Sequence, residues 1–70
     1  MEPRFLTLAD VQEALNIKSA QAYALVRSGE LRAIQVGGRN TWRIEASELE
    51  AYIERQYKAA RLRAKSESEA

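Results

Sequence analysis

The 70-residue chain contains neither cysteine nor histidine. Without cysteine it has no disulfide framework and no thiolate metal site. Without histidine it lacks the imidazole of serine-type triads and zinc hydrolases as they are usually built. It also has no apolar stretch near the roughly twenty residues that span a bilayer, and its N-terminus lacks the regions of a signal peptide. We therefore expect a soluble, cytoplasmic protein with no membrane contact.

Acidic side chains are the remaining candidates for acid–base chemistry. Glu45, Glu48, Glu50 and Glu54 occur at a helical, solvent-facing spacing and without the signal of a cleft. A chain of this length forms one small domain and buries only about sixty per cent of its unfolded surface. We therefore expect a protein that is not an enzyme and has no catalytic residues, no metal and no cofactor.

The charge is nearly balanced overall, at +1, but it is unevenly distributed along the chain. Between residues 18 and 43 a single acid, Glu30, accompanies a group of bases. These bases are Lys18, Arg27, Arg32, Arg39 and Arg43. Residues 44–57 carry four acids against one base, Arg55, and a second group of bases follows them. A segregated field of this kind orients a protein toward a polyanion, although clusters of charge also simply solvate exposed surfaces.

Two short helices are predicted in the first half of the chain. Thr7 and Asp10 form a capping box that opens a helix over residues 8–15, and Asn16 suits the left-handed conformation that ends it. Apolar residues at three-and-four spacing predict a second helix over residues 19–28, which Gly29 ends. Two short helices joined by a tight turn are the layout of a helix-turn-helix.

A β-hairpin is predicted after the second helix. Alternation places Ile34, Val36, Trp42 and Ile44 on one side of a two-stranded ribbon. The other side then carries Ala33, Gln35, Thr41 and Arg43. The tip, Gly37-Gly38-Arg39-Asn40, holds one long cation among residues that tolerate positive φ, where a nucleic-acid groove could receive it. Taken alone, this tip also fits an ordinary turn with a solvated arginine.

The third predicted helix is the longest. Ser47 and Glu50 indicate a capping box at its start. Its buried face is predicted to consist of Leu49, Tyr52, Ile53, Tyr57 and Ala60. The apolar stripe then ends, so we assign residues 1–60 to one domain and residues 61–70 to a basic, then acidic, flexible C-terminal tail. The bases near this boundary form either a phosphate-binding extension or a solvated helix end; they are Lys58, Arg61, Arg63 and Lys65.

These elements together predict the fold class α+β. The expected architecture is a small winged helix-turn-helix, with three helices and a two-stranded antiparallel β-hairpin wing between the second and third. The outward stripe of the second helix, Ala20, Tyr23, Ala24 and Arg27, carries candidate nucleic-acid contacts, because short residues permit close approach to a major groove. Gln21 pairs well with adenine. The alternative is that Tyr23 packs on the hairpin and the alanines only favour helix formation.

Four motifs stand out along the chain: Phe5-Leu6-Thr7-Leu8-Ala9-Asp10-Val11, Arg27-Ser28-Gly29-Glu30-Leu31, Val36-Gly37 and Trp42-Arg43-Ile44. Their combination resembles the small MerR-like winged-helix DNA-binding domains of the excisionase and BldC type, over about residues 5 to 57. The resemblance implies that the second helix lies in the major groove of double-stranded DNA and that the wing approaches the minor groove. The candidate DNA-binding set is Lys18, Ser19, Ala20, Gln21, Tyr23, Ala24, Arg27, Arg39, Asn40 and Arg43.

Two positions depart from this family. Lys18 stands where relatives commonly open the second helix with Ser or Thr, so the cap comes from Ser19 or is missing. Ala24 stands where many relatives carry a long basic residue, which suggests weaker binding by a single copy.

The sequence thus predicts a sequence-preferring DNA-binding protein associated with the nucleoid. It would act as a small transcriptional regulator or as an architectural factor that assembles on repeated sites. The expected partners are double-stranded DNA, further copies of the chain on that DNA, and an integrase or the transcription machinery. An excisionase that bends attachment-site DNA uses the same surface. A protein-interaction module with solvated arginines is the alternative from another class.

Overall fold

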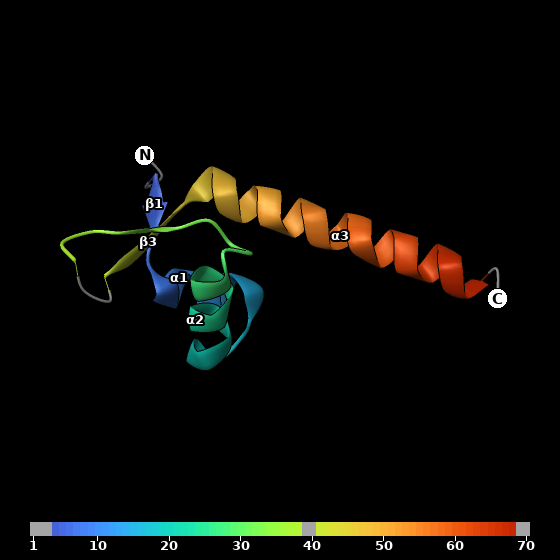
Figure 1. The fold of residues 1–70 in the computed structure, drawn as a ribbon, viewed down its shortest axis with the longest axis horizontal. Helices are drawn as coiled ribbons and strands as arrows, with labels where there is room; N and C mark the ends of the chain where they lie inside the picture. Colours follow the sequence, from blue (N-terminus) through green and yellow to red (C-terminus); the bar gives the residue numbers. More distant parts are fainter. Residues whose placement is uncertain (1–3, 39–40, 69–70) are drawn as a thin grey trace.

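The computed structural model describes residues 4–38 and 41–68, which form three helices and three short strands (Figure 1). They follow in the order β1 (Phe5–Leu6), α1 (Leu8–Leu15), α2 (Ser19–Ser28), β2 (Ile34–Gln35), β3 (Trp42–Glu45) and α3 (Ala46–Ser68). The antiparallel β2–β3 hairpin lies between the second and third helices, which confirms the α+β winged helix-turn-helix fold. Strand β1 was not predicted from the sequence; it joins the other edge of β3 and gives the strand order β1-β3-β2.

The ends of α1 confirm the predicted caps. The Thr7 hydroxyl accepts a hydrogen bond from the Asp10 backbone N–H at 3.1 Å, and the Asp10 carboxylate accepts one from the Thr7 N–H at 3.0 Å. Asn16 ends the helix in the left-handed conformation, with φ of 54°. Gly29 does the same for α2 with φ of 85°. These local signals define the helix-turn-helix before any tertiary contact is considered.

The hairpin has a different register from the predicted one. Ile34 pairs with Arg43, and Gln35 pairs with Trp42. Because directly paired residues point to the same side of a sheet, Ile34 shares a face with Arg43 and not with Ile44. The predicted assignment of β2 residues to the two faces is therefore wrong by one position.

The entry into β2 explains the shift. Leu31 lies immediately after α2 and is completely buried, and its N–H donates to the Leu25 carbonyl at 3.1 Å. Alternation from this anchor turns Ala33 toward the core, where it packs against the buried cluster. Ile34 and Val36 consequently point outward and are 52% and 51% exposed.

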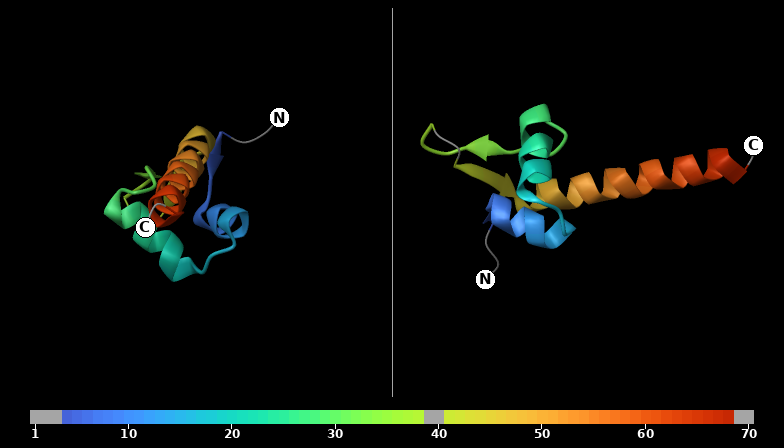
Figure 2. Two further views of the ribbon diagram at one scale, coloured as in Figure 1. Left: turned by 90° about the vertical axis from the view of Figure 1, so that its right-hand side faces the viewer. Right: turned by 90° about the horizontal axis from the view of Figure 1, so that it is seen from below.

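The core lies where α1, α2, β3 and the start of α3 meet. The buried cluster consists of Val11, Val26, Leu31, Ile44 and Leu49. Tyr52 and Ile53 of α3 pack against it, but Tyr57 is 63% exposed and Ala60 is also exposed. The predicted buried face of α3 is therefore wrong at its last two members, since the helix projects away from the other elements (Figures 1 and 2).

Both ends of α3 differ from the prediction. The helix begins at Ala46, so Ser47 lies within it and does not form the predicted cap with Glu50. The Ala46 N–H instead donates to the Arg4 carbonyl at 2.8 Å, and the Ser47 hydroxyl donates to the Glu45 carboxylate at 3.0 Å. At its other end the helix continues to Ser68, so residues 61–68 are helical although the sequence predicted a tail there. No described helix is long and apolar enough to cross a membrane.

Candidate nucleic-acid interface

The outward side of α2 is an open surface of the domain. Ala22 and Val26 turn inward and are buried. Ala20, Tyr23, Ala24 and Arg27 together line a shallow depression on the solvent side. All four are exposed except Tyr23, which is half-buried. The structure thus brings together the four residues of the predicted outward stripe on one accessible surface.

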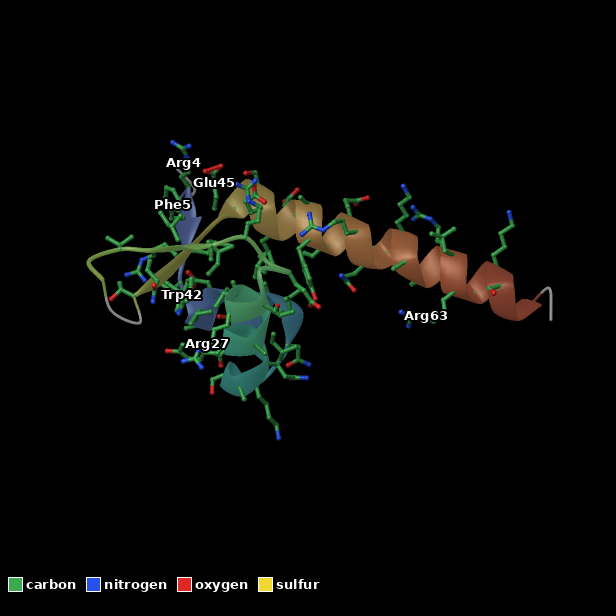
Figure 3. All side chains as sticks on the ribbon, viewed as in Figure 1. Arg4, Phe5, Arg27, Trp42, Glu45 and Arg63 are labelled. Carbon is green, nitrogen blue, oxygen red and sulfur yellow. The ribbon has the colours of Figure 1, made fainter. Side chains whose placement is uncertain are left out.

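Tyr23 and Arg27 form a small unit within this surface. The Arg27 guanidinium lies 5.5 Å from the centre of the Tyr23 ring, within the range of a cation–π contact. Arg27 is labelled in Figure 3, where it projects from α2. The ring holds the guanidinium on the α2 surface without neutralising its charge. An arginine held in this way remains able to bind a phosphate oxygen.

The start of α2 lacks a side-chain cap but has one contact that returns from within the helix. Ser19 is the first helical residue. The N-cap residue before it is Lys18, whose side chain makes no capping hydrogen bond. The side-chain carbonyl of Gln21 accepts a hydrogen bond from the Lys18 backbone N–H at 3.2 Å. This is only the returning half of a capping box. Of the two predicted alternatives, a cap from Ser19 or no cap, the second is confirmed, since no side chain among the described residues accepts a hydrogen bond from the first turn of α2. Gln21 therefore has a structural contact in addition to its candidate contact with a base.

The wing contributes one described member of the candidate set. Arg43 is half-buried on β3, on the same face as Ile34, and its Nη1 donates to the Trp42 carbonyl at 2.8 Å. Gly37 and Gly38 both have positive φ, 80° and 76°, which a tight turn at this point requires. Arg39 and Asn40, the predicted tip contacts, lie outside the described residues.

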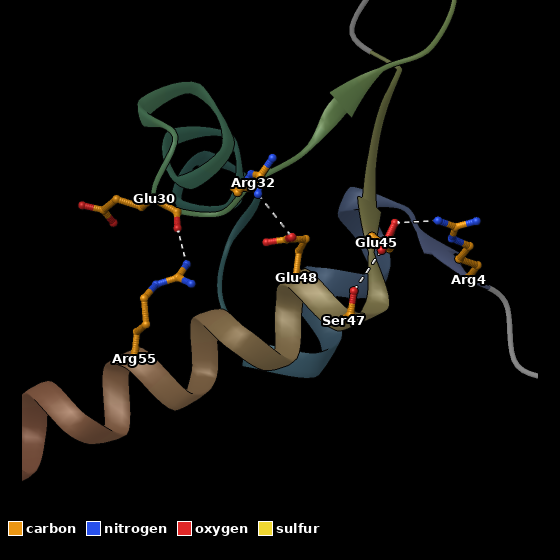
Figure 4. A network of polar contacts seen from close by, with 7 residues as sticks. All are labelled: Arg4, Glu30, Arg32, Glu45, Ser47, Glu48 and Arg55. Atoms are coloured by element: carbon orange, nitrogen blue, oxygen red, sulfur yellow. Dashed lines mark hydrogen bonds and ion pairs between the residues drawn. The ribbon is translucent and has the colours of Figure 1, made fainter.

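Ion pairs involve two bases outside α2. Arg4 lies 3.2 Å from the Glu45 carboxylate, and Arg32 lies 3.6 Å from that of Glu48 (Figure 4). Within the described residues, neither Lys18 nor Arg27 has an ion-pair partner. Among the bases between residues 18 and 43, Arg32 is therefore paired with an acid, whereas the two bases of the α2 region, Lys18 and Arg27, keep their positive charge unpaired in the described part of the chain.

The exposed apolar surface of the wing was not predicted from the sequence. Ile34 and Val36 flank the half-buried Arg43 on the outer face of the sheet. The alternation of Leu31 and Ala33 was the available signal, because a leucine at the end of a helix often anchors the following segment in the core.

The described residues contain no group of three or more side chains suited to bind a metal ion.

Residues 5–57 match the family described as "Helix-turn-helix domain", and this range covers more than half of the chain. No curated protein and no solved structure matches the chain significantly. The matched range begins in β1, contains the whole helix-turn-helix and the wing, and ends within α3. The chain therefore belongs to this helix-turn-helix domain family and is a DNA-binding helix-turn-helix protein.

Proposed function

We propose that the chain is a sequence-preferring, double-stranded DNA-binding protein that inserts α2 into the major groove. The supporting observation is the composition and exposure of the outward side of α2. The short side chains of Ala20 and Ala24 leave a shallow depression on the outward side of the helix, and beside it Arg27 provides a cation that has no ion-pair partner among the described residues. A helix with short outward residues can approach base edges closely, while flanking cations contact the phosphates.

The candidate contacts divide into two classes. Ser19 and Gln21, at the amino end of α2, are placed to contact base edges, as residues at the start of a recognition helix commonly do. Lys18, Tyr23 and Arg27 are assigned to phosphates. On the wing, Arg43 is a candidate backbone anchor and Arg39 a candidate minor-groove contact, in keeping with the resemblance to MerR-like domains. Minor-groove contact would respond to groove width and A·T content more than to a base code.

A single copy has limited affinity. One module of this size buries about 600–1,000 Å² of protein surface, and about four phosphate contacts give a salt slope near −3.6. We therefore propose that several copies assemble on repeated sites, as a nucleoid-associated regulator or architectural factor without enzymatic activity. An excisionase that bends attachment-site DNA for an integrase would use the same surfaces.

A protein-interaction module is the second candidate function. The exposure of Ile34 and Val36, at 52% and 51%, favours it, because two aliphatic side chains on one side of a short strand suit a protein contact better than a phosphate backbone. In that case binding to the partner would depend little on salt. The two functions are therefore distinguishable by the ionic-strength dependence of binding.

The test is selection of bound duplexes from a random pool at two salt concentrations, followed by sequencing. The wild type is compared with Ala24→Glu, which places a negative charge in the middle of the outward side of α2. The matched control is Ala51→Glu, the same change at an exposed position of α3. We expect salt-sensitive enrichment of a short repeated motif by the wild type and the control, and none by Ala24→Glu. Equal enrichment by all three proteins would exclude α2 from the interface.

A further inference from the structure

The projecting half of α3 carries a second positive surface that the proposed function does not use. Between Glu54 and Glu67 the chain contains five bases and no acid; they are Arg55, Lys58, Arg61, Arg63 and Lys65. Residues 57–66 are exposed except for Ala59, which is half-buried. Within the described part of the chain, neither Lys58 nor Arg61 nor Arg63 has a hydrogen-bond or ion-pair partner.

The helix dipole does not account for these charges. Bases near the C-terminus of a helix are favoured by its macrodipole, but that effect is confined to about the last turn. Lys58 and Arg61 lie well before Ser68, where α3 ends. Glu54 lies four residues before Lys58, a spacing that favours opposite charges, but the residues three and four positions from Arg61 include the bases Lys58 and Lys65 and no acid. Like charges at this spacing destabilise a helix slightly.

Two of the bases point away from the body of the domain. Lys58 follows Leu49 by nine residues, and Arg61 follows Tyr52 by the same interval. Nine residues equal about two and a half turns of an α-helix, so each base lies on the opposite side of α3 from its core-facing counterpart. Both counterparts belong to the core or pack against it. Lys58 and Arg61 are three residues apart and therefore share a face.

This face is separate from the proposed α2 interface. A pocket between α2 and α3 is lined by Gln21, Ala24 and Leu25 on one helix and by Tyr52 and Gln56 on the other. Tyr52 and Gln56 therefore mark the side of α3 that faces α2, and the Lys58–Arg61 face is directed away from α2. In the view of Figure 3, Arg63 lies on the side of α3 on which α2 lies.

We propose that the face of α3 formed by Lys58 and Arg61 binds the phosphate backbone of a second DNA duplex, so that the protein bridges two DNA segments. This goes beyond the proposed function and rests on it, because α2 must first hold the protein on one duplex. A phosphate backbone fits this face because exposed bases without hydrogen-bond or ion-pair partners bind polyanions independently of sequence, although the exposed Tyr57 and Leu62 border the face. Several copies on one duplex present several such helices, so weak individual contacts add through multivalency.

Bridging is measured in two steps. A duplex that carries the selected repeats is immobilised and saturated with protein, and after washing a labelled duplex of unrelated sequence is added at several salt concentrations. The test variant is Lys58→Gln/Arg61→Gln, since glutamine keeps the helix propensity and removes the charge. The control is Arg4→Gln/Arg32→Gln, which changes the net charge equally at two exposed bases that are already ion-paired. Circular dichroism verifies that α3 remains helical in both variants.

The wild type and the control are expected to capture the second duplex. At 0.1 M salt one phosphate contact contributes a factor of about 8 relative to 1 M salt, so the loss of both contacts weakens capture by about 60-fold. Loading on the first duplex should change less than about threefold. Capture at the wild-type level by the test variant, or an equal loss in both steps, overturns the proposal. Failure of the wild type to load on the first duplex contradicts the proposed function itself, and bridging is refuted with it.

Discussion

The two isoleucines of the hairpin provide a direct test of the observed register. Ile44 is completely buried, whereas Ile34 is 52% exposed. Both occur in the same alternating pattern, from which the sequence analysis placed them on one face. The structure places them on opposite faces, so replacement of each by alanine should have very different effects on the free energy of unfolding.

The two costs follow from burial. Isoleucine-to-alanine removes the equivalent of three methylene groups, or about 2.4 kcal/mol of transfer free energy when the side chain is fully buried. At Ile34 about half of this applies, which gives roughly 1 kcal/mol as an upper value. At Ile44 a cavity adds to the transfer loss, and the total is about 2–5 kcal/mol. A domain of this size has a total stability of only about 3.5–10 kcal/mol, so Ile44→Ala removes a large part of it.

Urea unfolding measures both values. Far-ultraviolet circular dichroism follows the helices, and the single tryptophan, Trp42, gives an independent fluorescence signal from β3. We expect the midpoint of Ile34→Ala to stay close to that of the wild type and the midpoint of Ile44→Ala to fall strongly, with a similar slope. Equal destabilisation by the two substitutions would refute the register and return Ile34 to the core face.

Three further changes test the capping and contact assignments. Thr7→Ala removes the cap of α1 and should lower the free energy of unfolding by about 1 kcal/mol in urea titration, whereas an unchanged value contradicts the observed capping box. Arg27→Gln should weaken binding to all duplexes and reduce the salt slope by about 0.9, and a loss restricted to one sequence would instead make it a base contact. Gln21→Glu keeps an acceptor for the Lys18 N–H, so stability should be retained while DNA affinity falls; wild-type affinity in a filter-binding titration would remove Gln21 from the interface.

The local parts of the fold could be predicted from the sequence. The Thr7–Asp10 pair, Asn16 and Gly29 act through contacts within a few residues, and all three were correctly interpreted. The strand β1 could not be predicted, because two residues carry no alternation to detect. Its existence depends on pairing with β3, forty residues away in the sequence, where Phe5 lies opposite Glu45. Such pairing is a property of the tertiary structure and not of either segment alone.

The candidate site shows the same division between local and distant information. The outward side of α2 follows from helical spacing, so Ala20, Ala24 and Arg27 were placed correctly on one surface. The contact between Gln21 and the Lys18 N–H at the start of α2 was missed, because Gln21 was considered only for the groups it offers to a ligand.

The end of the α3 core face was also beyond local patterns. Tyr57 continues the apolar spacing of Ile53, and spacing alone cannot tell where the rest of the domain stops covering a helix. In the structure the coverage ends near Ile53, and α3 then continues alone into solvent (Figure 2). A helix of this kind gains little from packing, and short isolated helices are marginal in water. Its bases are therefore carried on the least stabilised part of the fold, where binding to a polyanion would both use them and stabilise the helix that presents them.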